Sequence, residues 1–378
     1  MFHAQATRSS FHKQEKYKTM ATTTRILVIN PGSTSTKIAI YQQEKVIFLK
    51  TIKHPLEVLK PFKRVTDQFE YRKDMILEEL RDADVHLETI DAVIGRGGLV
   101  KPIKAGVYSV NEAMRQDLME CKRGEHASNL GGLIAYDIAK RLPNAEAFIA
   151  DPVVVDELDR LARYTGHPLF EKVPVFHALN QKAIARSHAK SIMRRYEEMN
   201  FIVAHLGGGI TVGAHEKGRV VDVNQGLDGD GPFSPERSGS LPAGSLLKAA
   251  FSGDYTYDEM ASMIVGKGGL VAYLGTNDVY IAEREAMDGD EKCKEVLEAM
   301  AYQVAKEIGA MSAVLRGEVD AILITGGIAN SKWFCNLIIE RVYRIAPIHF
   351  YPGQDEMGAL AENALLAING EIEVKEYF

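Results

Sequence analysis

Two stretches of the chain repeat one pattern, and this repetition limits the possible folds more than any other feature of the sequence. The first stretch is 26–41 and the second is 201–215. Each contains an apolar run that ends in a polar residue, a loop with glycine, and a second apolar run. A third apolar run follows at 45–54 and at 219–224. Internal similarity of this kind predicts a duplicated unit and two related domains, a number that suits a chain of 378 residues.

Apolar strands also alternate with helical segments along the chain. Short apolar runs at 91–94, 147–150 and 320–325 lie between stretches with helical spacing, such as 128–142 and 291–316. This alternation predicts α/β domains whose functional residues lie at the carboxyl edge of each sheet. Five predicted strands end in polar or glycine residues, a recurrence that packing alone does not readily explain. These endings are Asn30 with Ser33, Arg96, Asp151, His205, and Gly326 with Gly327.

The composition and charge of the chain exclude several classes of protein. The formal net charge is −6, whereas a protein that binds nucleic acid through its phosphates needs a strongly basic face. No run of about 20 apolar residues is present, so we expect no transmembrane helix and no membrane partner. The three cysteines are widely separated and lack the C-x-x-C spacing of a zinc site. We therefore expect reduced thiols in a cytoplasmic protein.

The first 24 residues differ in character from the rest of the chain. Residues 1–24 are polar, rich in basic and hydroxyl side chains, and without the apolar core of a signal peptide. A transit peptide is one interpretation of so acid-poor a segment. We expect instead a disordered extension from an upstream start codon, because Met20 lies just before the first predicted strand.

Each candidate residue has a structural interpretation as well as a functional one. The loop at 30–37 is either a phosphate-binding loop, with N–H groups and hydroxyls turned toward a ligand, or an ordinary hairpin turn. His205 is either a site residue or a hydrogen-bonded core histidine. Arg96 and Arg237 lie among glycine or proline residues, a setting that favours oxyanion binding over a role as surface charges.

Two acidic residues and one glycine pair also have two interpretations. Asp151 before Pro152 is either a helix cap or a ligand-binding residue. Glu356, at the start of the last predicted helix, is either placed there by the helix dipole or a ligand of Mg²⁺. Gly326 and Gly327 allow the backbone to approach a flat ligand such as adenine, although a lone glycine pair is a weak indication.

Six motifs of the sequence occur together in a known order. They are Asn30-Pro-Gly-Ser-Thr-Ser-Thr-Lys37, Arg96-Gly-Gly98, Phe176-His177, His205-Leu-Gly-Gly-Gly209, Glu236-Arg237-Ser-Gly239 and Thr325-Gly-Gly-Ile-Ala-Asn330. In these motifs and their order the chain resembles the acetate and butyrate kinases, from about residue 25 to the C-terminus. The resemblance is greatest to the butyrate kinase branch, because of the first motif and the run 150–157.

The resemblance implies an α/β fold of two duplicated actin-like ATPase domains, of the ribonuclease H-like kind, with a cleft between them. Residues 25–150 and 357–378 are expected in the N-terminal domain, and residues 151–356 in a C-terminal domain with nucleotide-binding elements. The implied activity is reversible, ATP-dependent phosphorylation of butyrate or a similar short-chain carboxylate to the acyl phosphate, by direct in-line transfer. Isobutyrate, propionate and acetate are alternative acids. A non-enzymatic ATPase switch, like an actin relative or a heat-shock chaperone, is the alternative of another class.

The resemblance also implies roles for the candidate residues. Arg96 and Arg237 are expected to orient the carboxylate and to stabilise charge on the transferring phosphoryl group. His177 and, to a lesser degree, His205 are expected to donate to the oxygens of that group. ATP or ADP is the implied co-substrate, and Mg²⁺ is the implied cofactor.

These expectations assign every candidate residue to one or more sets. The catalytic set is Arg96, Arg237, His177 and Asp151. The substrate-binding set is Arg96, Gly97, Gly98, Phe176, Arg237 and His126. The set for the nucleotide and its phosphates is Asn30, Ser33, Ser35, Lys37, His205, Gly207, Gly208, Gly209, Gly326, Gly327 and Asn330. The metal set is Asn30, Asp151 and Glu356.

One departure from the acetate kinases concerns the size of the acid. Those enzymes have two valines after the motif arginine, where this chain has Gly97 and Gly98. Because two branched side chains are missing, we expect room for a longer acyl tail. One methylene is worth only about 1–3 kcal/mol in an apolar pocket, so a preference for four-carbon acids is expected to be graded.

The expected partners are a short-chain carboxylate and ATP, with no nucleic acid and no membrane. By family analogy we also expect a homodimer or a higher homo-oligomer. The apolar stripe of 291–316 is one candidate contact surface.

Overall fold

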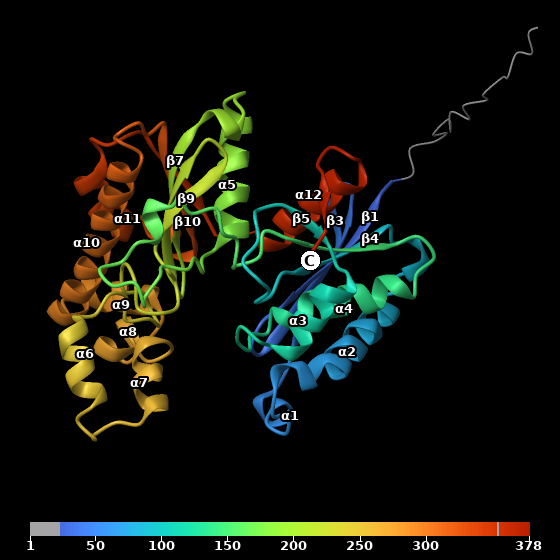
Figure 1. Ribbon diagram of the computed structural model, residues 1–378, viewed down its shortest axis with the longest axis horizontal. Coiled ribbons are helices and arrows are strands. Elements are labelled where there is room, and N and C mark those ends of the chain that lie inside the picture. The colour runs from blue at the N-terminus through green and yellow to red at the C-terminus, as the bar shows by residue number, and fades with distance from the viewer. Residues whose placement is uncertain (1–22, 354) are drawn as a thin grey trace, which may run out of the picture.

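Two mixed β-sheets organise residues 23–353 and 355–378, which are the residues described by the computed structural model (Figure 1). The first sheet has the strand order β12-β5-β6-β4-β1-β2-β3, and the second has the order β11-β10-β7-β8-β9. The first sheet consists of β1 (Arg25–Pro31), β2 (Ser35–Gln42), β3 (Lys45–Lys53), β4 (Ala92–Arg96), β5 (Val107–Ser109), β6 (Glu146–Ala150) and β12 (Val374–Lys375). The second consists of β7 (Asn200–Leu206), β8 (Ile210–Glu216), β9 (Arg219–Val223), β10 (Ala321–Gly326) and β11 (Ile348–Pro352). The predicted extension 1–24 lies outside the described residues except for its last two.

Helices cover both sheets and connect their strands. The helices of the first half are α1 (Leu56–Leu59), α2 (Phe69–Asp82), α3 (Glu112–Glu120), α4 (Asn129–Lys140) and α5 (Ala178–Ser191). Those of the second half are α6 (Ala243–Ala250), α7 (Tyr257–Ile264), α8 (Gly269–Leu274), α9 (Val279–Met287), α10 (Glu291–Val314), α11 (Lys332–Val342) and α12 (Glu356–Ile368). Short 3-10 helices are η1 (Val65–Gln68), η2 (Leu87–Thr89), η3 (Leu161–Arg163), η4 (Tyr196–Glu198) and η5 (Gly327–Asn330).

The strand order confirms the predicted duplication. Strands β3-β2-β1-β4-β6 and strands β9-β8-β7-β10-β11 follow one another in the same order and with the same relative directions. In each copy the pairing of the second and third strands has one register shift, at Ile40/Tyr41 and at Ala214/His215. The two glycine-containing loops therefore occupy equivalent places, one between β1 and β2 and the other between β7 and β8.

Successive side chains of the central strands point to opposite faces of each sheet, and each face is covered by its own helices. In β7, Ile202 and Ala204 pack with α10 and α11, whereas Phe201 and Val203 pack with α5. In β1, Ile26 and Val28 face α12, and the intervening residues face α2 and α4. The last long helix therefore returns to the first sheet, and Figure 1 shows α12 in the lobe of β1 and β4.

Three details differ from the sequence predictions. The helix predicted from 178 to 199 ends at Ser191, because Met193 adopts a left-handed conformation (φ 57°) and η4 follows. The sequence pattern also misses β5, β11, β12 and α8, each of which has six residues or fewer and therefore gives little periodic signal. The apolar stripe of 291–316 is not a free contact surface, since Leu297, Met300 and Val304 are buried in the core beneath α10.

Two further observations concern the helices and the cysteines. Among the described residues, no helix combines the length and the apolar character needed to cross a membrane. The three cysteines are free thiols, and two of them, Cys293 and Cys335, are buried.

Candidate active site

A small pocket between the two lobes brings together residues that are far apart in the sequence. Arg96 ends β4, Asp151 follows β6, His177 precedes α5 and Glu356 begins α12. These positions are carboxyl ends of strands and N-termini of helices, where α/β folds commonly form binding sites. The pocket is lined by Arg96, Gly97, Ala150, Asp151, Pro152, Val153, His177, Ala178, Leu179, Asn180 and Glu356.

Arg96 and Glu356 form a bidentate ion pair in this pocket. Nη1 of Arg96 lies 3.1 Å from Oε2 of Glu356, and Nη2 lies 3.1 Å from Oε1. Nδ2 of Asn30 donates to the same Oε2 at 2.7 Å. Two parallel N–H···O bonds hold a guanidinium and a carboxylate in one plane, so the ends of β1, β4 and α12 are joined here.

Asp151 is buried in a strained backbone conformation. Its φ is 36°, a region that side chains other than glycine rarely adopt. Oδ1 accepts from the backbone N–H of Gly106 at 2.7 Å, and Oδ2 accepts from Nη1 of Arg186 at 3.1 Å. No helix begins at Pro152, so the interpretation of Asp151 as a helix cap is wrong. Strain of this kind, held by two hydrogen bonds, is typical of functional sites.

The oxygen atoms of Asn30, Asp151 and Glu356 form a donor set that suits Mg²⁺, because this ion prefers oxygen ligands and is commonly bound by one or two carboxylates. Asn30 and Glu356 are in direct contact, and Asp151 lines the same pocket as Glu356. Both carboxylate oxygens of Asp151 already accept hydrogen bonds from the protein. Those of Glu356 are also bonded, to Arg96 and Asn30, but the side chain of Glu356 is 14% exposed and that of Asp151 is fully buried, so Glu356 is the more accessible carboxylate.

His177 and His205 stack on each other, with ring centroids 3.9 Å apart and an interplanar angle of 17°. Burial lowers the pKa of both rings, to about 3 for His205 and well below the usual value for His177. Both rings are therefore neutral at pH 7 and carry one proton each. Nδ1 of His205 lies 2.9 Å from the acceptor Oδ1 of Asn180, so the proton of His205 is on Nδ1. The expected donation from His205 to a phosphoryl oxygen requires Nε2 and is disfavoured by this arrangement.

Arg237 reaches the histidines from the long loop 226–239. Its Nη1 donates to the carbonyl oxygen of Gly226 at 2.5 Å. The guanidinium lies against Gly209, where a Cβ atom would come within 1.9 Å of Nη1. Glycine at 209 is therefore required for Arg237 to lie across the loop between β7 and β8.

Both predicted arginines act on the same group of histidines. After the larger effect of burial, the positive charges of Arg96 and Arg237 lower the pKa values of His126, His177 and His205. Arg96 comes from the first sheet and Arg237 from the loop that follows the second. The structure therefore brings two arginines from different lobes to one set of imidazoles.

Gly97 and Gly98 are buried, and their missing side chains do not leave free space. A Cβ atom on Gly97 would lie 2.6 Å from Cβ of Pro152. One on Gly98 would lie 2.5 Å from Oδ1 and 2.6 Å from Cα of Asn129. The expectation that these glycines make room for a longer acyl tail is therefore wrong at their Cβ positions, because neighbouring atoms already fill them.

Phe176 also differs from its predicted role. It is 3% exposed and packs with Val155, Leu158 and Val220, and it does not line the pocket that contains His177. The aromatic ring therefore supports the loop before α5 from within the core.

The loop between β1 and β2 is held from beneath by Arg72, a residue that sequence reasoning missed. Arg72 is 1% exposed, and it donates to the carbonyl oxygens of Gly32 at 2.7 Å and Ser33 at 2.8 Å. Oε1 of Gln68 accepts from Nε and Nη2 of Arg72. Desolvation lowers the pKa of Arg72 to about 10, which leaves it charged at pH 7. With these carbonyls bound inside, the exposed side chains of Ser33 and Lys37 remain on the outer side of the loop.

The second glycine loop is tied to the segment that contains Arg237. The carbonyl oxygen of Gly208 accepts from Oγ of Ser234 at 2.7 Å, and the N–H of Gly207 donates to the carbonyl oxygen of Gly209 at 3.2 Å. Gly208 is exposed. The loop is therefore ordered by its own contacts while one side of it stays open.

Gly326 and Gly327 at the end of β10 have different physical reasons to be glycine. Gly326 has φ 95°, and its Cβ would lie 2.2 Å from the carbonyl oxygen of Leu206. Gly327 is exposed, and no atom lies within 4 Å of its Cβ position. The carbonyl oxygen of Gly327 accepts from Asn330 at 3.0 Å and from the hydroxyl of Tyr280 at 2.9 Å. Tyr280 is a further residue that the sequence pattern does not reveal, because nothing in α9 distinguishes it.

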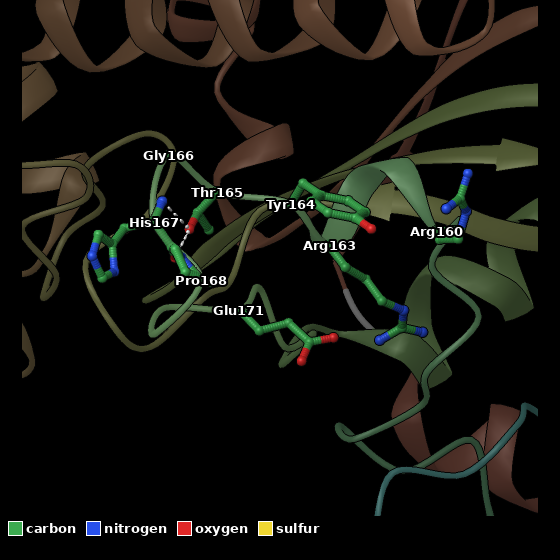
Figure 2. A pocket seen from close by; sticks show the side chains of 8 residues that line it. All are labelled: Arg160, Arg163, Tyr164, Thr165, Gly166, His167, Pro168 and Glu171. Carbon is green, nitrogen blue, oxygen red and sulfur yellow. Dashed lines mark hydrogen bonds between the residues drawn. The ribbon is translucent and has the colours of Figure 1, made fainter.

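A second hollow lies in the segment 160–171, and Figure 2 shows the side chains that line it. Its internal contacts are local, such as the hydrogen bond of 2.9 Å from Oγ1 of Thr165 to the carbonyl oxygen of His167. Nη2 of Arg163 forms an ion pair with Oδ1 of Asp156 at 2.5 Å. None of the predicted site residues lines this hollow, so the pocket between the lobes remains the candidate active site.

Comparison with known proteins gives consistent results for sequence and for fold. The profile described as the Acetokinase family matches residues 174–352. Butyrate kinase 1 and butyrate kinase 2 of Clostridium acetobutylicum are each 52% identical to this chain over 353 residues, which is 93% of this chain and 99% of each relative. The crystal structure of Porphyromonas gingivalis acetate kinase superposes with a TM-score of 0.76 at 18% identity, over 91% of this chain and 100% of that one. This likeness shows the fold, which is the predicted pair of duplicated actin-like ATPase domains.

Proposed function

This chain belongs to the acetokinase family, and on that premise we propose that it transfers the γ-phosphoryl group of ATP to butyrate or a similar short-chain carboxylate. The observation that carries the proposal is that Arg96 lines one pocket with the neutral His177, and that Arg237, from the other lobe, lies close enough for its charge to lower the pKa of the same ring. Butyrate is chosen because the two similar relatives are named butyrate kinases. Isobutyrate, propionate and acetate remain alternative acids. A nucleotide switch without chemistry needs no such pair of arginines.

The acid needs positioning rather than activation. A carboxylate is ionised at pH 7 and is its own nucleophile, so no general base is required. Two N–H groups of Arg96 bind Glu356, which leaves three of its five donors for a substrate oxygen. Arg237 approaches from the other lobe, and the two guanidinium groups together orient the carboxylate and oppose the charge that develops during transfer.

His177 serves as the neutral hydrogen-bond donor to the transferring phosphoryl group. Its lowered pKa means that it donates without carrying a charge at pH 7. A preorganised donor contributes only when it is aimed at the oxygens that gain charge in the transition state. The reverse reaction, from the acyl phosphate to ATP, uses the same contacts.

Mg²⁺ is assigned to the oxygen donors of Asn30 and Glu356, with Asp151 acting through water. When bound, this ion neutralises charge on the phosphate oxygens. The loop of Ser33, Ser35 and Lys37 faces the phosphates.

The other nucleotide contacts come from the second lobe. We assign the phosphates to the loop 207–209 and the adenosine to the open side of Gly327, with Asn330 and Tyr280 beside it. The exposed backbone of Gly327 permits the close approach that a flat base requires.

The test of the proposal separates phosphoryl transfer from nucleotide binding. Arg96→Ala and Arg237→Ala should each lower kcat/KM for acyl phosphate formation by about 10²–10³-fold, the usual effect of losing a donor to developing charge. Affinity for ATP, measured by isothermal titration calorimetry, should change little. Arg160→Ala, at an exposed arginine of the hollow in Figure 2, is the control and should keep the wild-type rate. Unchanged transfer in both site variants would contradict the proposal, and joint loss of transfer and ATP affinity would indicate a structural role.

A homo-oligomer is part of the same proposal, with the contact moved from α10 to α6 and α7. Neither of these two helices has a buried residue within the single chain. Leu247, Phe251 and Tyr257 are 60%, 81% and 85% exposed. Exposed apolar side chains gathered on adjacent helices favour a protein contact at this surface.

A further inference from the structure

A continuous chain of buried hydrogen bonds connects Tyr196 to the proposed donor His177. The hydroxyl of Tyr196 lies 2.7 Å from Nδ1 of His215, and Nε2 of His215 lies 3.0 Å from Oε1 of Gln181. Nε2 of Gln181 donates to Oγ1 of Thr211 at 2.9 Å, and this hydroxyl lies 2.9 Å from Nδ1 of His177. Tyr196, His215, Gln181 and Thr211 are all between 0% and 4% exposed. Water therefore does not compete for these hydrogen bonds.

One backbone carbonyl group fixes which end of the Gln181 amide donates and which end accepts, and the directions of the neighbouring hydrogen bonds follow from this. Nε2 of Gln181 also donates to the carbonyl oxygen of Thr211, at 3.1 Å. A carbonyl oxygen only accepts, so the reversed amide would place two acceptors against each other. The amide of Gln181 must therefore present its NH₂ group to Thr211 and its oxygen to His215.

The orientation of Gln181 also decides which atoms donate in the hydrogen bonds toward Tyr196. Because Oε1 of Gln181 accepts, His215 must carry its proton on Nε2, and its Nδ1 accepts from the hydroxyl of Tyr196. Burial lowers the pKa of His215 and raises that of Tyr196, so both groups are neutral at pH 7, as this assignment requires.

The same orientation decides which atoms donate in the hydrogen bonds toward the pocket. Oγ1 of Thr211 accepts from Gln181, and its only other hydrogen-bond partner among the described residues is Nδ1 of His177, so the buried hydroxyl proton is donated to that nitrogen. A neutral imidazole that accepts on Nδ1 holds its proton on Nε2. The ring of His177 therefore presents its N–H group on Nε2, on the side away from Thr211. In His205 the proton is on Nδ1 and is donated to Asn180.

The spacing of these residues follows from the elements that carry them. His177 and Gln181 are four residues apart at the start of α5, and Thr211, Gly213 and His215 alternate on one face of β8. A Cβ atom on Gly213 would lie 2.5 Å from Oε1 of Gln181. Glycine at 213 therefore makes space for the amide between Thr211 and His215.

We propose that Thr211, Gln181, His215 and Tyr196 are positioning residues that hold His177 in the tautomer with its proton on Nε2. In this state His177 donates to the phosphoryl group during transfer. The inference deepens the proposed function and rests on it for the identity of the reaction, but the tautomer itself can be measured without turnover.

The test compares Thr211→Val with Thr211→Ser. Valine keeps the shape and removes the hydroxyl, so kcat should fall at least about tenfold with little change in KM, whereas serine should restore most of kcat; the upper limit is the roughly 10²–10³-fold loss of a whole donor. Long-range ¹H–¹⁵N correlation spectra of histidine-labelled protein, with His177 assigned from a His177→Gln variant, should show a protonated Nε2 in wild type and in Thr211→Ser. Thr211→Val should lose that pattern.

The role of Tyr196, at the end of this series of hydrogen bonds that is farthest from His177, can be tested with a matched control. Tyr351 contacts Nδ1 of His188 at 2.7 Å, the same arrangement as Tyr196 with His215, but without a connection to His177. Tyr196→Phe should alter the tautomer signal of His177 and lower kcat, whereas Tyr351→Phe should change neither.

Two results would overturn the inference. One is a wild-type His177 protonated on Nδ1, and the other is an unchanged tautomer signal in both Thr211→Val and Tyr196→Phe. A wild-type protein that forms no acyl phosphate, yet shows the expected tautomers, would contradict the proposed function and leave the positioning role supported.

Discussion

His177 and His205 are neighbouring rings with different chemical roles, because their partners differ. Asn180 accepts from Nδ1 of His205, and Thr211 donates to Nδ1 of His177. The sequence predicts both histidines as site residues from their positions after strands and in motifs. It does not predict which ring carries a donor, since that depends on partners brought together only by folding.

The buried state of His205 predicts how stability depends on pH. Its pKa is about 3 in the folded protein, so the unfolded chain binds a proton first as the pH falls. The free energy of unfolding should therefore decrease once the pH falls below the unfolded value of about 6.5. Between about pH 7 and about pH 5.5, this one ring should account for a decrease of about 1 kcal/mol.

Urea unfolding of wild type and His205→Gln at these two pH values measures that contribution. The decrease should be smaller in the variant, which has no titrating ring at this position. His86→Gln, at an exposed ring, is the control for the loss of an imidazole elsewhere. Equal decreases in wild type and His205→Gln would contradict the assignment of His205 as a buried neutral ring.

At the scale of elements, the end of β4 is packed directly against α4. A Cβ atom on Gly131 of α4 would lie 2.3 Å from the carbonyl oxygen of Arg96, and Gly98 meets Asn129 at the start of the same helix. Gly98 therefore serves the contact between strand and helix, whereas Gly97 packs against Pro152. The acyl tail must find its space elsewhere in the pocket.

Gly98→Ala tests this packing role. The added methyl group meets backbone atoms of Asn129, so the free energy of unfolding should fall by about 1–3 kcal/mol. The kcat/KM values should fall by similar factors for every acid. Gly309→Ala, in α10 with no atom near its Cβ position, should instead be neutral or stabilising by up to about 1 kcal/mol. Unchanged stability together with a shift of preference toward acetate would favour the original pocket interpretation.

Elements with long, regular patterns are predictable from the sequence, and short or buried polar features are not. The spacing predicts α2, but it places Arg72 on a helix whose charged residues read as solvent-exposed. Arg72 is buried because the carbonyl oxygens of Gly32 and Ser33, forty residues away, provide its acceptors. The short strand β12 depends on pairing with β5 and has almost no local signal.

At the scale of the whole molecule, the duplicated pattern predicts two sheets with one topology, and the structure confirms it. The motifs predict the family, which the sequence comparisons confirm. We propose the domain division 25–150 with 357–378, and 151–356, because α12 packs on the first sheet. A contact between two copies of the chain cannot be located from the sequence, because an apolar stripe such as that of α10 has the same sequence pattern whether it is buried in the core or exposed.

The proposed oligomer predicts the effect of charge on α6. The double variant Leu247→Asp with Phe251→Asp should convert a multimeric wild type to single chains, because both side chains are exposed in the single chain and become buried only in the contact. Light scattering coupled to size-exclusion chromatography gives the mass. Tyr164→Asp, at an exposed aromatic residue of the hollow in Figure 2, is the control and should keep the wild-type mass. A monomeric wild type, or a double variant of unchanged mass, would contradict the contact.

The central claim is that the pocket between the lobes phosphorylates a short-chain carboxylate. Hydroxylamine trapping of acyl phosphate, with ATP, Mg²⁺ and straight and branched acids from acetate to valerate, tests it most directly. We predict that hydroxamate forms only with both ATP and acid, that kcat/KM is highest for a four-carbon acid, and that Arg237→Ala loses the product. The account would be contradicted by ATP hydrolysis at one rate with and without acid, and no hydroxamate from any acid in the series.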